Sequence, residues 1–351
     1  MKETNSIYFI AEIGGNHEGS LKRAIDLIQL AAENGATAVK FQHFTPEDLV
    51  NSNAISKIPA EFSPHKKSGE EVLKILEKLS VPLEWTEKLF STCQNFNVDF
   101  ITAPYDLKSI ENLVDFVSCF KVGSGDLNWH EKLRILRDTK KHIILSTGAA
   151  TFDEVERAMQ TLDGYHDKVT LLQCNSNYDS DLSAMRATNL NVLQTYKKRW
   201  PKIKIGLSDH QKPLAPVLGA VANGATVIER HFSDDPSRVG ADHRVALSPS
   251  EWSNMVRECQ FLISAMGSYK KELQSNEKGT RITQRRGLWA AKDLFKDHVI
   301  TRADLLVLRP ALPGTISPEL MSKLIGKKLL TDMKKLDAFN FENIDDEAVL
   351  S

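Results

Sequence analysis

Eight short apolar runs alternate with amphipathic segments along most of the chain. The runs, in order, are IYFIAEIG, ATAVKFQ, VDFITAPY, CFKVGSGD, HIILSTGA, KVTLLQCN, IKIGLSD and ATVIERHF. The segments between them, such as LKRAIDLIQLAAEN and FDEVERAMQTL, carry apolar residues at helical spacing. Several end at a Gly just before the next run, which is a common helix C-terminal signal. Eight successive strand–helix units predict an α/β fold, a TIM (β/α)8 barrel with a closed parallel sheet.

Length and composition are those of a soluble enzyme with more than one domain. The 351 residues suit a barrel of about 250 residues plus one further domain. A formal net charge of −1 gives no global basic field, so we expect no binding to nucleic acid or to a membrane surface. There is no signal-peptide pattern and no apolar run near the roughly 18–20 residues of a membrane span. The four cysteines form no CxxC pair, so we expect a cytoplasmic protein.

The chain divides by composition into a barrel, a linker and a small domain. A polar stretch, KKELQSNEKGTRITQ, follows the last helix predicted for the barrel. We therefore expect a TIM-barrel catalytic domain over 1–269, a linker over 270–284 and a small β-rich domain over 285–351. The connection from about His43 to Leu83 is unusually long. Its mixed polar and proline content predicts a lid or substrate loop rather than a missed core element.

Two histidines and two lysines stand at the ends of predicted strands. His210 ends IKIGLSDH, His231 ends TVIERH, and Lys40 and Lys121 end two earlier runs. The carboxyl ends of barrel strands meet at one mouth, where such enzymes keep their chemistry. Two imidazoles there indicate a divalent-metal site, and the lysines favour an anionic substrate. Ordinary hydrogen bonds at the rim are the alternative for the histidines.

The motifs FIAEIGGNHEGSL, AVKFQ, ITAPYD, FKVGSGD, ILSTGA, IGLSDH, IERHF and GADH follow one another through the barrel. In order and spacing they resemble those of the sialic acid synthase family. RRGLWAAKDLFKDHVITRADL is similar to the family's C-terminal domain, which resembles type III antifreeze protein and is called the SAF domain. The resemblance covers nearly the whole chain. It implies a nonulosonate synthase, which condenses phosphoenolpyruvate with an open-chain N-acylhexosamine to give a nine-carbon 2-keto-3-deoxy acid and phosphate.

The resemblance also implies roles for individual residues. The metal ligands are His210 and His231, for manganese first, with magnesium or cobalt as alternatives. The residues at the phosphoenolpyruvate positions, which supply cations and hydroxyl donors, are Lys40, Thr102, Lys121, Ser124, Ser146 and Ser176. Those at the sugar positions are Gln42, Asp126, Tyr178, Asp242 and Arg309, and catalysis falls to Glu12, His231 and Asp242. Local turn hydrogen bonds are the alternative for the hydroxyl residues, and an ion pair with Lys40 or Lys121 is the alternative for Asp126.

Arg309, in VLRP, matches a family arginine that reaches the N-acyl group of the sugar in the other subunit. The resemblance therefore implies a domain-swapped homodimer in which each small domain caps its neighbour's barrel. A surface arginine without a partner is the alternative.

Four stretches depart from the family's pattern: CNSNYDSD has Asp179 in place of proline, RPALPGTIS replaces a Gly-rich stretch, RRGL has Gly287 in place of serine, and GADH replaces GPDH. All four face the sugar in the family. The acceptor therefore stays open between N-acetylmannosamine and a 2,4-diacetamido-trideoxyhexose of the legionaminic or pseudaminic type. No added basic cluster argues for a 6-phosphorylated acceptor.

Three other functions compete with this interpretation. A Schiff-base aldolase of pyruvate would use Lys40 or Lys121 as its nucleophile, which leaves the two histidines unexplained. Related phosphoenolpyruvate-condensing synthases of shorter sugar acids lack the appended domain. A non-catalytic carbohydrate- or ice-binding protein does not suit the charged small domain, in stretches such as KDLFKDH.

Overall fold

The computed structural model describes residues 7–59, 61, 67–177, 182–240 and 242–345. The chain consists of two compact units, Met1–Gly267 and Ser268–Ser351, and each has its own apolar core. The segment predicted as a linker carries two short helices, η5 (Ser275–Glu277) and α13 (Lys278–Gln284). Neither has a buried residue, so no core packing holds them.

The first unit is a closed barrel of eight parallel strands in chain order, which confirms the predicted TIM barrel. Each strand coincides with one of the apolar runs. The strands are β1 (Tyr8–Glu12), β2 (Ala38–His43), β3 (Asp99–Pro104), β4 (Cys119–Val122), β5 (His142–Ser146), β6 (Val169–Cys174), β7 (Lys204–Asp209) and β8 (Val227–His231). Pairing of β8 with β1 closes the barrel and places Glu12 opposite His231.

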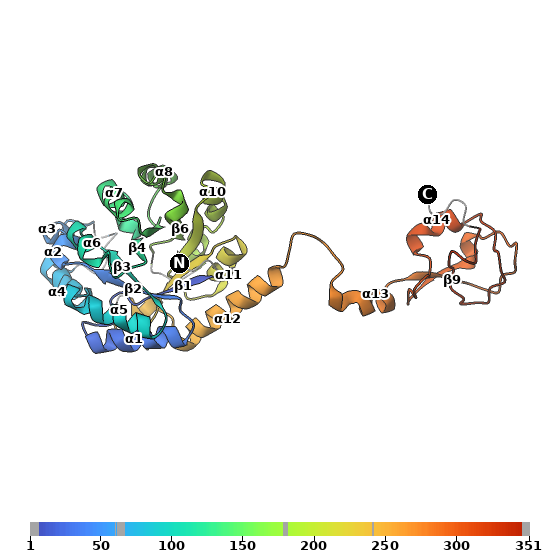
Figure 1. Cartoon of the computed structure of the whole chain (residues 1–351), viewed down its shortest axis with the longest axis horizontal. Coiled ribbons are helices and arrows are strands. Elements are labelled where there is room, and N and C mark those ends of the chain that lie inside the picture. Colours follow the sequence, from blue (N-terminus) through green and yellow to red (C-terminus); the bar gives the residue numbers. More distant parts are fainter. Residues whose placement is uncertain (1–6, 60, 62–66, 178–181, 241, 346–351) are drawn as a thin grey trace. The chain divides into compact units, whose positions relative to one another are not determined.

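Helices surround the strands on the outside of the barrel (Figure 1). They are α1 (Leu21–Glu33), α5 (Thr86–Asn95), α6 (Leu107–Leu113), α7 (His130–Asp138), α8 (Phe152–Thr161), α9 (Leu182–Ala187), α10 (Val192–Arg199), α11 (Ala215–Ala222) and α12 (Pro249–Met266). Gly35 and Gly224 follow α1 and α11 with φ of +93° and +90°, as the glycine stop signals predict. No helix in the described part of the chain is long and apolar enough to cross a membrane.

The long connection after β2 forms three helices rather than a plain loop. These are α2 (Pro46–Leu49), α3 (Ser52–Ile55) and α4 (Gly69–Leu79). None of these three helices buries a residue, as expected for a segment that is not a missed core element. The ends of the connection do reach the core, through Phe44 and Val81. Its closure over a substrate stays a prediction.

Alternation along the strands separates two apolar layers. The interior layer consists of Tyr8, Ile10, Ala38, Ile101, Cys119, Ile144, Leu172 and Val227. Residues of the opposite parity, such as Phe41 and Phe120, pack in the core between strands and helices. Along each strand, the residue two positions after the one in the interior layer also points toward the barrel axis, but it lies nearer the carboxyl end of the strand. This places Glu12 above Ile10 and Lys40 above Ala38.

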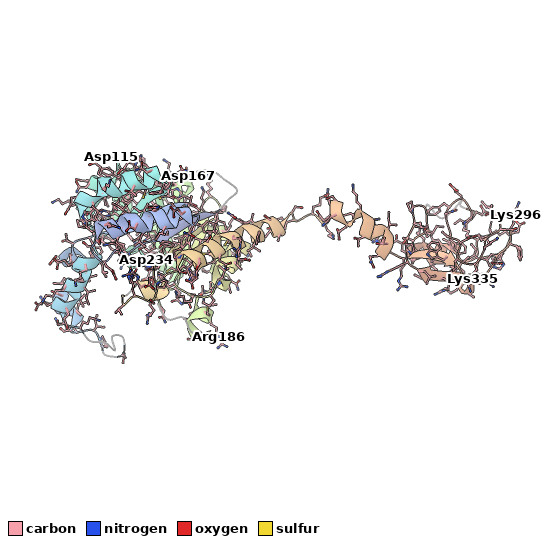
Figure 2. All side chains as sticks on the ribbon, turned by 90° about the horizontal axis from the view of Figure 1, so that it is seen from below. Asp115, Asp167, Arg186, Asp234, Lys296 and Lys335 are labelled. Atoms are coloured by element: carbon pink, nitrogen blue, oxygen red, sulfur yellow. The ribbon has the colours of Figure 1, made fainter. Side chains whose placement is uncertain are left out.

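The second unit is less regular than the predicted β-rich domain. Its described residues form one antiparallel pair, β9 (Gly287–Ala290) with β10 (Leu305–Leu308), and a short helix α14 (Met321–Leu324). Isolated bridges, such as Leu294 with Met333, replace longer ladders. Positive φ angles occur at several turns of this unit, as at Gly326. Charged side chains such as Lys296 and Lys335 lie on the surface of this unit (Figure 2).

Candidate active site

A polar cavity of about 210 Å³ lies at the carboxyl ends of the strands. Among the residues named from the sequence, it is lined by Glu12, Lys40, Gln42, Lys121, Ser124, Ser146, Ser176, His210 and His231. They come from β1, β2, β4, β5 and β8 and from the turns that follow β4, β6 and β7. The barrel thus brings together in one cavity side chains that are far apart in the sequence.

Two buried lysines and two buried carboxylates form the floor of this cavity. Lys40 Nζ lies 2.7 Å from Glu12 Oε2 and 3.9 Å from Glu229 Oε1. Lys121 Nζ lies 3.8 Å from the same Glu229 oxygen and donates to Ser146 Oγ at 2.7 Å. Glu229 therefore bridges the two ammonium groups, and the lysines are held on one face of the cavity.

Burial and charge set opposite protonation tendencies for the two lysines. Burial acts to lower the pKa of Lys40, but the carboxylates of Glu12 and Glu229 outweigh it and raise the pKa above the ordinary lysine value. Burial lowers the pKa of Lys121, and Glu229 offsets this only in part. Burial would raise the pKa of Glu229, but Lys121 and Lys40 hold it below the ordinary value. A bound anion beside Lys121 would favour its charged form.

Backbone and hydroxyl groups converge beside Lys121. Gly148 N donates to Ser124 Oγ at 2.9 Å. A Cβ at Gly148 would lie 2.1 Å from Ser176 Oγ and 2.8 Å from Ser124 Oγ, so a side chain there would displace both hydroxyls. Hydroxyl and ammonium groups such as these are the donors that phosphate and carboxylate oxygens need.

The two histidines lie next to each other in the same cavity. The ring centroids of His210 and His231 are 5.4 Å apart with an interplanar angle of 42°. His210 Nδ1 lies 3.0 Å from Asn175 O, which places the proton on Nδ1 and the lone pair on Nε2. Burial lowers the pKa of both imidazoles, so both favour the neutral form that binds metal ions.

This donor set fits a divalent cation held by two protein ligands. No group of three or more His, Cys, Asp or Glu side chains suited to a metal ion occurs among the residues that the structure describes. His210 and His231 would therefore supply two imidazoles and leave the other coordination positions to water and substrate. Open positions are what a catalytic metal requires.

Asp242 reaches the site from the loop after β8. Its Oδ2 accepts from Gly15 N at 2.9 Å and lies 3.8 Å from His231 Nδ1. A Cβ at Gly14, which has φ of +50°, would lie 2.4 Å from the same oxygen. An ion pair between Arg23 and Asp234 at 2.5 Å ties the same loop to α1, and Asp234 is labelled in Figure 2. The loops after β1 and β8 thus hold the carboxylate beside the histidines.

Thr102 lies outside the cavity, which differs from the prediction. Its hydroxyl is fully buried, donates to Phe41 O at 3.2 Å and contacts His43 Nδ1 at 2.6 Å. The reason is strand alternation. Ile101 belongs to the interior layer, so Thr102 faces the helices. We therefore no longer assign Thr102 to the phosphoenolpyruvate site.

Asp126 does not line the cavity either. It forms an ion pair with Lys132 at 2.6 Å, rather than with Lys40 or Lys121. Lys132 Nζ also lies 5.4 Å from the centroid of the Tyr105 ring, which lines the cavity. Asp126 thus anchors the turn after β4, and its contact with the sugar stays a prediction.

Two further predicted residues are not part of the described cavity. Tyr178, like Asp179, lies outside the described residues. Arg309 belongs to the second unit, where it donates to Gln284 Oε1 at 2.6 Å.

Six cavity residues were not among the predicted site residues: Tyr105, Gly123, Gly125, Cys174, Ser208 and Glu229. A signal for two of them was present in the sequence. Glu229 precedes His231 by two positions and Ser208 precedes His210 by two positions. Since alternate strand residues share a face, each histidine predicts an inward-facing neighbour two positions earlier.

Known proteins similar to this chain carry related names. A family model described as the NeuB family matches residues 27–271. The N,N'-diacetyllegionaminic acid synthase of Campylobacter jejuni subsp. jejuni is 33% identical over 332 residues, 93% of this chain and 96% of the relative. The pseudaminic acid synthase of the same organism is 31% identical over 336 residues, 95% of each chain.

A solved structure is similar in fold and sequence. The N-acetylneuraminic acid (sialic acid) synthetase of Leptospira borgpetersenii superposes with a TM-score of 0.68 at 28% identity, over 79% of this chain and 90% of that chain. Together with the matches in sequence, it confirms the resemblance that the eight motifs indicate. The chain belongs to the NeuB family, the family of sialic acid-type (nonulosonate) synthases.

Proposed function

We propose that this protein condenses phosphoenolpyruvate with an open-chain N-acylhexosamine in a metal-dependent reaction. The products are a nine-carbon 2-keto-3-deoxy acid and phosphate. The observation that carries the proposal is the single cavity in which the Lys40–Glu229–Lys121 array lies beside the imidazoles of His210 and His231. It offers one subsite for an anion and one for a polarised aldehyde.

Phosphoenolpyruvate would bind on the lysine side. Lys40 and Lys121 supply two cations, while Ser124, Ser146 and Ser176 supply hydroxyls at the same wall. Charge-assisted hydrogen bonds of this kind hold phosphate and carboxylate oxygens in a fixed orientation. The enol carbon would then point toward the histidine side of the cavity.

The acceptor sugar would bind on the histidine side. His210 and His231 would hold a divalent cation, manganese first and magnesium or cobalt as alternatives. The chemistry that such an ion supplies when bound is polarisation of an aldehyde oxygen. Gln42 and Asp242 flank this side and offer hydrogen bonds to sugar hydroxyls. The names of the two Campylobacter jejuni relatives favour a 2,4-diacetamido-trideoxyhexose over N-acetylmannosamine as the acceptor.

Glu12 would serve the second half of the reaction. Attack of the methylene carbon (C3) of phosphoenolpyruvate on the aldehyde carbon forms the carbon–carbon bond, and the aldehyde oxygen becomes a hydroxyl by taking up a proton. An oxocarbenium-like centre is left at C2, the carbon that carries the phosphate. Water adds there, gives up a proton, and phosphate departs. Glu12 lies 2.7 Å from Lys40 Nζ and accepts from Gln42 Nε2 at 2.5 Å, so its carboxylate stands between the two subsites. A carboxylate so placed can take the proton from the water.

A mass spectrum of the products tests this proposal directly. Phosphoenolpyruvate, the diacetamido sugar and Mn²⁺ should give a nine-carbon keto acid and one phosphate for each sugar consumed. Consumption of pyruvate in place of phosphoenolpyruvate would contradict the proposal.

The lowered pKa of Lys121 favours one second candidate, a Schiff-base aldolase of pyruvate, because a neutral amine is nucleophilic. The two mechanisms differ in a simple assay. Borohydride in the presence of pyruvate would trap a covalent adduct on Lys121 in an aldolase. We expect no adduct, and we expect chelator to stop turnover.

We also propose that the second unit is an SAF domain and that Arg309 acts in the barrel of a partner subunit. Two variants, Arg309→Ala and His231→Ala, test this by complementation. Each should be nearly inactive alone. A mixture that has exchanged subunits should regain activity, because some barrels then keep His231 and receive an intact Arg309. Absence of recovery in a mixture shown to contain heterodimers would contradict the swapped arrangement.

A further inference from the structure

Asp209 and Arg230 form a buried ion pair on the outer side of the barrel. They are direct Cα partners on β7 and β8, and Arg230 Nη1 lies 3.4 Å from Asp209 Oδ2. Only 3% of Asp209 and 1% of Arg230 is exposed. Their charges are therefore removed from water where the strands face the helices.

The pair lies directly behind the two histidines. His210 follows Asp209 in the chain, and His231 follows Arg230. Because alternate residues point to opposite faces, the imidazoles face the cavity while the ion pair faces outward. Asp209 with Arg230 is also the last pair in the β7–β8 ladder, so the backbone register ends where the histidines begin.

Asp209 fixes the chain on the far side of His210 as well. Its Oδ1 accepts from Gln211 N at 3.2 Å. The backbone of His210 is thus restrained in two ways. The carboxylate of Asp209 accepts a hydrogen bond from the next residue, Gln211, and it also pairs with Arg230 on the neighbouring strand. A change in the distance between β7 and β8 at this point would change the spacing of the two imidazole rings.

The pair is a poor device for stability alone. Within the described residues, Arg230 Nε and Nη2 and Asp209 Oδ2 have no hydrogen-bond partner. Buried ion pairs that lack further hydrogen bonds often contribute nothing to stability, and apolar replacements of similar volume are frequently tolerated. Their attested benefit is a defined geometry.

We infer that Asp209 and Arg230 are positioning residues that set the spacing of His210 and His231 and thereby the affinity of the site for a divalent cation. This inference rests on the metal site of the proposed function. Neither Asp209 nor Arg230 is expected to contact a substrate.

Binding of Mn²⁺ alone to the metal-stripped, full-length protein tests the inference, with free Mn²⁺ followed by electron paramagnetic resonance. The main variant is the double replacement Asp209→Leu with Arg230→Met, which leaves neither charge unpaired. We expect its Kd for Mn²⁺ to rise by about 10- to 100-fold, the usual cost of losing a group that orients metal ligands. Its metal-free melting temperature should stay near that of the wild type or rise.

A second, milder variant keeps the inference testable if the double variant fails to fold. Asp209→Asn preserves the shape of the side chain and an acceptor for Gln211 N, but it removes the charge that faces Arg230. We expect its Kd for Mn²⁺ to rise by about 10-fold. A Kd within about twofold of the wild type in whichever of these variants folds would overturn the inference.

Tyr8→Phe is the matched control. Tyr8 Oη donates to Asp99 Oδ2 at 2.5 Å, a side-chain link between strands at the opposite end of the barrel. We expect this change to lower the melting temperature and to leave the Kd for Mn²⁺ unchanged.

The design separates the inference from the metal assignment. If the wild type binds no Mn²⁺, the metal site of the proposed function fails. If the wild type binds Mn²⁺ and His231→Ala loses it, while the Asp209 and Arg230 variants keep it, only the inference fails.

Discussion

Glu12 and Lys40 form a buried ion pair at 2.7 Å across β1 and β2, and their Cα atoms are direct partners in the parallel ladder. On its other side Glu12 is the Cα partner of His231 in β8. The carboxylate therefore stands between the cation that we assign to phosphoenolpyruvate and the imidazole that we assign to the metal. This is where the two substrates would meet.

Glu12→Gln should separate binding from chemistry. The amide keeps the shape of the side chain but cannot take a proton from water. We expect kcat to fall by about 10²- to 10⁴-fold, the usual contribution of a general base. The KM for phosphoenolpyruvate should change far less, because Lys40 and Lys121 remain. Steady-state kinetics on a variant with an unchanged melting temperature checks this, and a kcat close to that of the wild type would remove Glu12 from the mechanism.

Gly148→Ala should damage the anion subsite. The new Cβ would come within 2.1 Å of Ser176 Oγ and 2.8 Å of Ser124 Oγ, so both hydroxyls must move. Loss of one or two hydrogen bonds to a charged group corresponds to about 1.5–3 kcal/mol each, or at least a tenfold higher KM for phosphoenolpyruvate. Gly279→Ala in α13 is the control, since a Cβ there meets nothing within 4 Å. Equal KM values for the two variants would contradict the assigned subsite.

Thr102→Val tests the correction to the sequence-based prediction. The hydroxyl faces His43 and the backbone of Phe41 rather than the cavity. We expect no change in the KM for phosphoenolpyruvate and a loss of about 1–3 kcal/mol in the free energy of unfolding, because buried partners lose a hydrogen bond. Kinetics and urea unfolding measure the two effects. A clear rise in KM at unchanged stability would return Thr102 to the substrate site.

His43 should make the stability of the barrel depend on pH. Burial lowers the pKa of His43 to about 3, whereas an unfolded histidine titrates near 6.5. Between about pH 6.5 and pH 3, His43 is therefore protonated in the unfolded state and neutral in the folded state. Stability falls as pH falls through this window, by up to about 1.4 kcal/mol per pH unit for this group. It is constant above the window.

The variant His43→Gln isolates this contribution. Its free energy of unfolding at pH 7 should be lower, because the contacts with Thr102 and Thr86 change. Its decline between pH 6.5 and pH 4.5 should be shallower than that of the wild type. Urea unfolding at several pH values measures both slopes, and identical slopes would show that His43 takes up its proton in the folded state.

The barrel could be predicted from the sequence because its signals are local and repeated. Each strand is an apolar run, and glycine stop signals such as Gly35 precede the next strand. The residues at the strand ends then follow from topology, since parallel strands must present their carboxyl ends on one side. The places of Lys40, His210 and His231 at the mouth of the barrel follow from this rule.

The predictions failed where the role of a residue depends on which face of a strand it occupies or on which side chain it contacts. The role of Thr102 was inferred from the resemblance to the family, but Ile101 faces the interior, so its neighbour Thr102 faces the helices. The partner of Asp126 is Lys132, six residues later on α7, and no motif contains both. In the second unit the pairing of β9 with β10 joins segments that are distant in the sequence, and the composition of the unit does not reveal where that pairing ends.

Phosphate release from phosphoenolpyruvate with Mn²⁺ is the most direct test of the central claim. The acceptors to compare are the two 2,4-diacetamido-trideoxyhexoses, N-acetylmannosamine and its 6-phosphate. We predict release with a diacetamido sugar, no release after chelation of the metal, and near loss of release in His231→Ala. Release that persists without metal, or in His231→Ala at saturating Mn²⁺, would contradict the assignment of the site.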